Sequence, residues 1–224
     1  MNGTRIGLAI LLIGALAAYL SFSGNETADD SHRLSRQLVL HFTLGRTDKP
    51  IVVLGDSIVE ASTLPRSLCG HPIVNAGLSR ASTASDLGTW LADALGSKQV
   101  AAIVVALGMN DALISSLSRQ QFQLNYGALL AQLSTRTPHV FVLAIPPVVA
   151  QKQITPETQT SAMGRINAYN SILPELATKN GATFIALPPM PQPHTVDGVH
   201  LNAAGDLAWE KAVLQGVSTI CNPN

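Results

Sequence analysis

The residues with the clearest chemical potential in this sequence are a serine in its first third and an Asp/His pair near its end. Ser57 follows the apolar segment 51–55 almost directly, and Asp197 precedes His200 by three residues on a Pro-rich loop. A serine hydroxyl is a weak nucleophile and needs a neighbouring base. His200 can supply that base, and Asp197 is near enough along the chain to orient its ring. The pattern indicates acyl transfer, with Ser57 as the nucleophile.

Acyl transfer also needs hydrogen-bond donors for the negative oxygen that develops in the transition state. Three donors follow apolar segments: the backbone N–H of Ser57, the backbone N–H of Gly77 and the side-chain amide of Asn110. We expect these groups to form an oxyanion hole. Asp56 and Asp111 lie beside them and are expected to hold their turns through hydrogen bonds.

Each of these residues also has a purely structural interpretation. Ser57 is a residue type that caps helices, Gly77 is compatible with a simple turn, and Asn110 with an Asx-turn. His194 competes with His200 for the role of base, because it lies on the same loop. We favour His200, since Asp197 precedes it and a capped helix is expected to follow it.

Five apolar segments are typical of strands buried on both faces, because they run without alternating polar residues. They are residues 51–55, 72–77, 100–108, 139–147 and 182–187. Helical patterns follow at 83–95, 121–133, 163–181 and 202–216. This alternation predicts an α/β fold with a parallel sheet and helices on both faces, whose ligand site lies beyond the carboxyl ends of the strands.

Several residues set the expected limits of these helices. Pro174 predicts a break or kink in the third pattern, which should end at Asn180 and Gly181. Asn202 is expected to cap the fourth helix, and Gly216 to stop it.

Four sequence blocks, in this order, resemble the SGNH (GDSL-type) hydrolase superfamily over residues 50 to about 216. They are "GDS" with Ser57, "NAGLS" with Gly77, "GMND" with Asn110 and "DGVH" with His200. The resemblance implies a catalytic Ser57, His200 and Asp197, with an oxyanion hole of Ser57, Gly77 and Asn110. It also implies a flavodoxin-like three-layer α/β/α sandwich with five parallel strands, and no cofactor or metal.

The chain departs from the family pattern at two positions. Ile58 follows the serine where the family name has Leu, and Arg80 stands where many relatives have a small residue, often Gly. Ile58 keeps an apolar side chain and is a mild change. Arg80 concerns the loop shape and the substrate near the oxyanion hole, not the chemistry. An α/β-hydrolase is not indicated, because no G-x-S-x-G pentapeptide occurs.

Composition restricts the class of partner. The chain has 224 residues, of which 46% are hydrophobic and 12% charged, and its formal net charge is zero. No cluster of Lys and Arg occurs, so nucleic acid is not expected as a partner. The expected partner is a small-molecule, lipid or glycan ester.

The N-terminus is typical of an export signal. Arg5 precedes the uncharged segment 6–22, which predicts a signal peptide or signal anchor over residues 1–23 and an association of 6–22 with a membrane. We read residues 24–48 as a tether or surface helix and 49–224 as the hydrolase domain. The domain would then be periplasmic, secreted or anchored to the membrane.

The chain contains two cysteines, Cys69 and Cys221. In an oxidising compartment such a pair can form a disulfide, which would tie the C-terminus to the first third of the chain. The alternative is two unrelated buried thiols. Polar turn residues beside both cysteines favour the disulfide.

Together these features predict an exported or membrane-anchored serine esterase that hydrolyses a carboxylic ester or thioester through an acyl-serine intermediate. Acetyl esters of sugars or envelope glycans and fatty-acyl esters are both plausible substrates. An acyltransferase uses the same acyl-enzyme and stays open as an alternative. A non-catalytic envelope protein that keeps the fold is the alternative from another class.

Overall fold

The computed structural model describes residues 29–151 and 154–221, and the predicted export segment 1–23 lies outside them. The chain divides into two compact units, Met1–Val39 and Leu40–Asn224. None of the helices in the described ranges combines the length and apolar composition needed to cross a membrane.

The larger unit begins within a helical segment, residues 29–45. Leu40 and Leu44 of this segment are buried in the hydrophobic core. The ammonium group of Lys98 donates hydrogen bonds to the carbonyl oxygens of Leu44 and Thr47. The lysine thus binds carbonyl groups at and just beyond the C-terminal end of the helix, where a cation is favoured.

A parallel sheet of five strands forms the centre of the larger unit, as predicted. In sheet order the strands are β3 (His71–Gly77), β1 (Ile51–Gly55), β4 (Ala102–Ala106), β5 (Val140–Leu143) and β6 (Thr183–Ile185). This is the strand order of flavodoxin-like folds. Gly55 pairs with Gly77 on one side and with Ala106 on the other. The three strands therefore end level, and the segments that follow them emerge at one edge.

The sheet has a sixth strand, which corrects the prediction of five. β2 (Ser67–Leu68) pairs antiparallel with the start of β3. Cys69 and Gly70 form the turn between them, and both have positive φ angles, 52° and 82°. Two-residue hairpin turns of this kind suit right-twisted strands. Two residues are too few to produce a recognisable apolar segment, so the sequence pattern did not reveal this strand.

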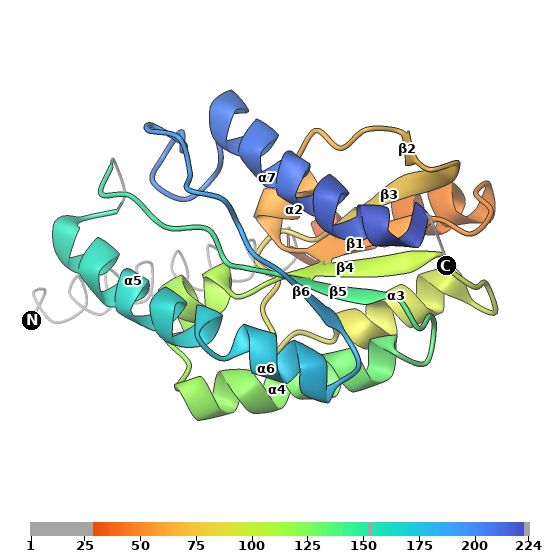
Figure 1. Cartoon of the computed structure of the whole chain (residues 1–224), viewed down its shortest axis with the longest axis horizontal. Helices are drawn as coiled ribbons and strands as arrows, with labels where there is room; N and C mark the ends of the chain where they lie inside the picture. Colours follow the sequence, from red (N-terminus) through yellow and green to blue (C-terminus); the bar gives the residue numbers. More distant parts are fainter. Residues whose placement is uncertain (1–28, 152–153, 222–224) are drawn as a thin grey trace, which may run out of the picture. The chain divides into compact units, whose positions relative to one another are not determined.

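Helices cover both faces of the sheet (Figure 1). α2 (Ser57–Ala61) and α7 (Ala203–Val217) lie on one face, whereas α3 (Leu87–Leu95), α4 (Arg119–Leu133) and α6 (Leu173–Lys179) lie on the other. α5 (Pro156–Asn170) precedes α6, and the expected break occurs between them, with Pro174 in the first turn of α6. The result is a three-layer α/β/α sandwich.

Two details of the helices differ from expectation. Asn202 caps α7 as predicted, but Gly216 does not end it, because the helix continues to Val217. A Cβ atom on Gly216 would collide with the side chain of Ile185 in β6, so this glycine permits close packing. A π-helical turn, η1 (Asp111–Ser115), was not anticipated from the sequence.

A disulfide joins Cys69 to Cys221, across a sequence separation of 152 residues. Cys69 lies in the turn between β2 and β3, and Cys221 ends the short helix η2 (Ser218–Cys221) that follows α7. The bond therefore connects the edge hairpin of the sheet to the C-terminal segment. The structure therefore contains the disulfide, and not the alternative of two separate thiols.

Replacing both cysteines by serine is expected to lower the free energy of unfolding. A disulfide restricts the unfolded chain, and its removal typically costs ~2–5 kcal/mol. Urea denaturation of the double variant Cys69→Ser/Cys221→Ser, beside the oxidised and the reduced wild type, measures this change. An unchanged midpoint in the double variant would show that the bond does not contribute to stability.

Candidate active site

Ser57 lies where β1 turns into α2. Asp56 caps this helix, since its carboxylate Oδ1 accepts a hydrogen bond of 2.9 Å from the backbone N–H of Ile58. The helix-capping role considered for Ser57 therefore belongs to Asp56, and the Ser57 hydroxyl is available for another partner. A Cβ atom on Gly55 would collide with the Ala106 carbonyl oxygen, so only glycine fits at this turn.

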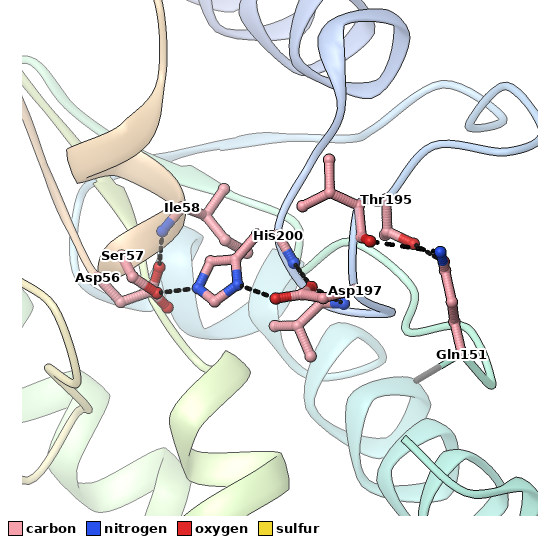
Figure 2. A network of polar contacts seen from close by, with 9 residues as sticks. Asp56, Ser57, Ile58, Gln151, Thr195, Asp197 and His200 are labelled. Atoms are coloured by element: carbon pink, nitrogen blue, oxygen red, sulfur yellow. Dashed lines mark hydrogen bonds and ion pairs between the residues drawn. The ribbon is translucent and has the colours of Figure 1, made fainter. Parts of the chain in front are cut away.

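The hydroxyl of Ser57 contacts His200, and His200 contacts Asp197 (Figure 2). Ser57 Oγ lies 3.0 Å from His200 Nε2, and His200 Nδ1 lies 2.7 Å from Asp197 Oδ2. A carboxylate can only accept, so Nδ1 carries the proton and donates it to Asp197. The lone pair of Nε2 then faces the Ser57 hydroxyl, as a general base requires.

The loop that carries His200 is held by its own hydrogen bonds. The second carboxylate oxygen of Asp197 accepts from the backbone N–H groups of Val199 and His200, at 2.9 and 2.8 Å. Gly198 has a φ of 101°, and a Cβ atom there would collide with the carbonyl oxygen of Val149. Asp197 thus fixes both the ring and the backbone of His200.

His194, the competing histidine, takes no part in this arrangement. Its side chain is buried, with Nε2 3.1 Å from the Pro147 carbonyl oxygen and Nδ1 3.1 Å from Gln192 Nε2. Both ring nitrogens therefore have partners, one on the same loop and one on the loop after β5. Within this structure it is His200, and not His194, that contacts Ser57.

Gly77 and Asn110, the other predicted oxyanion donors, both have acceptors in this structure. The N–H of Gly77 donates to Asn75 Oδ1 at 2.9 Å, and Asn110 Nδ2 donates to the Ala81 carbonyl oxygen at 2.8 Å. An amide nitrogen carries two hydrogens, so Asn110 keeps a second donor. A Cβ atom on Gly77 would collide with the backbone of Glu60, so glycine is also required here for packing against α2.

Two acids that the sequence did not mark as catalytic hold the loop after β3. Glu60 Oε2 accepts from the backbone N–H and the hydroxyl of Ser79, both at 2.7 Å. Asp111 accepts from the backbone N–H of Thr83 at 3.1 Å and from its hydroxyl. The expectation for Asp111 is met, whereas Glu60 was missed. Its only signal was its place one turn after Ser57 on the same short helix.

Burial raises the pKa of two acids beside the site, Asp56 and Asp111. Desolvation raises the pKa of Asp56 to about 7, and the hydrogen bond from Ile58 and the proximity of His200 only partly offset it. Desolvation also raises the pKa of Asp111, against the hydrogen bonds from Thr83. Perturbed acids of this kind gather at functional sites.

Asp197 behaves in the opposite way. Desolvation acts to raise its pKa, but the hydrogen bonds from the His200 side chain and from two backbone N–H groups outweigh that effect and lower the pKa. Asp197 is therefore the ionised acid of the site. Within the described ranges, no group of three or more His, Cys, Asp or Glu residues could hold a metal ion.

Comparison with known proteins identifies a family and a set of similar folds. Residues 53–208 match the model of the GDSL-like lipase/acylhydrolase family. A Streptococcus pneumonia structure named after platelet activating factor is similar at 22% identity and a TM-score of 0.73, covering 88% of this chain and 98% of that one. No curated protein matched the sequence.

Two further solved structures are similar to this chain. The M. smegmatis aryl esterase has 17% identity and a TM-score of 0.64, covering 77% of this chain and 99% of its own. A carbohydrate acetylesterase from Sinorhizobium meliloti has 20% identity and a TM-score of 0.63, covering 77% and 100%. At these identities the likeness shows a shared fold.

Asp56→Asn is expected to change how stability depends on pH. The carboxyl of Asp56 has a pKa near 3.8 when unfolded and about 7 when folded. Between these values the folded state keeps a proton that the unfolded state releases, so this group destabilises the fold as pH rises. The wild type should lose stability relative to Asp56→Asn from pH 4 to 7, by an amount on the order of a few kcal/mol.

Denaturant unfolding of both proteins at several pH values measures this difference. Asp93→Asn removes one exposed carboxylate from α3 and is the matched control for the loss of an acid. A flat profile for Asp56→Asn would contradict the buried, protonated state of Asp56.

Proposed function

Because the chain belongs to the GDSL-like lipase/acylhydrolase family, an assignment that supports ester hydrolysis, we propose that it is a serine esterase with an acyl-serine intermediate. The observation that carries this proposal is the contact sequence Ser57–His200–Asp197, with distances of 3.0 and 2.7 Å. A nucleophile, a base and an orienting acid in this order form a catalytic triad.

Acylation begins with attack of Ser57 Oγ on the ester carbonyl carbon. His200 Nε2 takes the hydroxyl proton as the new C–O bond forms, and Asp197 stabilises the resulting imidazolium. The carbonyl oxygen becomes an oxyanion in a tetrahedral intermediate. His200 then returns the proton to the alcohol oxygen as the C–O bond to the alcohol breaks, and the acyl group remains on Ser57.

The oxyanion requires donors that are already in place. The backbone N–H of Ser57 lies at the first position of α2, where no intrahelical partner exists. The second amide hydrogen of Asn110 is the next donor. Gly77 contributes if its N–H leaves Asn75 Oδ1, to which it donates in this structure. α2 has only five residues, so individual N–H groups matter more here than a helix dipole.

Deacylation uses the same residues in reverse. A water molecule gives its proton to His200 Nε2 and attacks the acyl carbon, and collapse of the second intermediate releases a carboxylic acid and restores the Ser57 hydroxyl. The side chain of His200 is 41% exposed, so water can reach the base.

We also propose that the enzyme is exported. The charged and apolar pattern of residues 1–23 is typical of a signal. The disulfide between Cys69 and Cys221 supports this, because such bonds persist in oxidising compartments and are rare in the cytosol. Fractionation of cells that produce the full chain, with thiol trapping before lysis, should recover the oxidised protein outside the cytoplasm. Recovery of reduced protein in the cytosol would contradict export.

Ser57→Ala and His200→Ala should each lower esterase activity on the order of 10⁴-fold or more, because the triad acts as a unit. Asn110→Ala should lower kcat about 100- to 1,000-fold while Ser57 remains reactive. The assay is hydrolysis of p-nitrophenyl esters from acetyl to long acyl chains by the purified full-length chain. Labelling of Ser57 by a fluorophosphonate is measured in parallel.

His194→Gln is the matched control, because it changes a histidine of the same loop that does not contact Ser57. It should retain labelling of Ser57 and most of the activity of the folded protein. Loss of activity in His194→Gln with retention in His200→Ala would reverse the assignment of the base. Equal inertness of the wild type and Ser57→Ala, without labelling, would overturn the enzymatic function.

A further inference from the structure

A groove of about 420 Å³ opens beside His200. One wall is formed by α2 and the segment that follows it, and the other by the first half of α7. Ile58 and Ala61 line it from α2, and Leu207 and Glu210 line it from α7. The volume is sufficient for a small organic group. The groove therefore adjoins the base of the candidate triad, because His200 is one of its lining residues.

The chemistry of acyl transfer determines which part of an ester can reach this groove. His200 must protonate the alcohol oxygen, so the alcohol lies on the side of its Nε2 atom. The residues that line the groove include His200 and Ile58, the neighbour of Ser57, but not Ser57, Asn110 or Gly77. The groove thus adjoins the base that protonates the alcohol, and not the expected oxyanion donors.

The lining carries negative charge. Asp206 and Glu210 lie one turn apart on α7 and both line the groove, whereas no Lys or Arg residue does. The backbone N–H and the hydroxyl of Thr63 donate to Asp206 Oδ2, which fixes this carboxylate at the wall. Within the described ranges, Glu210 has no hydrogen bond or ion pair to another side chain that would neutralise it.

Part of the remaining wall is apolar. Ile58, Leu201 and Leu207 contribute aliphatic side chains, and Leu207 is 65% exposed, so its surface is accessible to a ligand. The uncharged polar residues Thr63 and Asn202 also line the groove. Aliphatic walls with carboxylates at one side suit a cation that carries methyl or methylene groups. An anionic group would meet two like charges without a compensating cation.

We propose that this groove is the subsite for the alcohol part of the ester, and that it favours alcohols with a positively charged, alkylated amine over anionic alcohols. The inference rests on the proposed esterase function and names the substrate class of that site. Glu210 and Asp206 are the residues that determine this specificity, and Leu207 and Ile58 provide the apolar contact.

Three acetyl esters of similar size test the proposal: acetylcholine, its uncharged isostere 3,3-dimethylbutyl acetate, and the anion 2-acetoxyethanesulfonate. All three form the same acetyl-Ser57, so differences in kcat/KM report the alcohol alone. The full-length wild type should prefer the cation over the neutral ester and the neutral ester over the anion. An opposite or absent order of preference would overturn the proposal.

Variants locate the preference in the groove. Glu210→Gln should reduce the ratio of kcat/KM for the cationic to the neutral ester about threefold, as expected for one partly exposed charge. Glu210→Lys should invert the preference toward the anion. Glu175→Gln removes an exposed carboxylate from α6, on the other face of the sheet. It should leave the ratio of kcat/KM for the cationic to the neutral ester unchanged, and likewise the ratio for the anionic to the neutral ester. A ratio that responds equally to Glu175→Gln and Glu210→Gln would assign the effect to net charge and overturn the proposed subsite.

A steric variant separates the alcohol from the acyl side. Ala61→Phe places a ring in the groove and should lower kcat/KM for 3,3-dimethylbutyl acetate more than for methyl acetate. If it instead changes the preference for acyl chain length at a fixed alcohol, the groove binds the acyl group and the proposal fails. If p-nitrophenyl acetate is not hydrolysed at all by the wild type, the esterase function fails, which is a distinct result.

Discussion

The candidate site depends on the burial of β1 between two parallel neighbours. All five residues of β1 are buried, and the strand pairs with β3 on one side and with β4 on the other. A strand bonded along both edges and covered on both faces cannot slide without losing hydrogen bonds and exposing apolar surface. Ser57 therefore has a fixed position, and His200, 143 residues later, must be brought to it.

Four carboxyl groups around the site have different roles because their surroundings differ. Asp197 accepts from a histidine ring and two backbone N–H groups and stays ionised, with a lowered pKa. Asp56, the residue directly before Ser57, is enclosed by the core, and its pKa is raised to about 7. Asp111 and Glu60 hold the loop after β3 against the ends of β4 and β1. Residue type alone would not distinguish these roles. They are distinguished by the number of hydrogen-bond donors to each carboxyl group and by the access of water to it.

The sequence was most informative where a pattern repeats or where chemistry restricts the residue type. The five parallel strands were predictable because each is a continuous apolar segment, and Asn202 and Pro174 marked helix limits through local backbone chemistry. The grouping of Ser57 with Asp197 and His200 followed from the rule that functional residues gather at the carboxyl edge of a parallel sheet. The structure places these three side chains within hydrogen-bonding distance.

The features that the sequence did not reveal depend on contacts between distant segments. β2 is only two residues long and exists because it pairs with β3. Gly216 has the local character of a helix stop, yet the helix continues because Ile185 packs against it. Glu60 resembles any exposed helical acid until the loop with Ser79 is folded over it. Local patterns cannot report such contacts, because the partner lies far away in the chain.

The disulfide closes most of the larger unit into a covalent ring from Cys69 to Cys221. Asn110, Asp197 and His200 lie within this ring, whereas Ser57 precedes it. A single cut in any loop between the two cysteines would open the ring without releasing a fragment. The two pieces of a chain cut in this way would stay linked through the disulfide, and noncovalent packing would keep them folded together. The loop with His200 would therefore remain attached to the β2–β3 hairpin. This linkage therefore separates a cut in the backbone from the loss of one part of the candidate site.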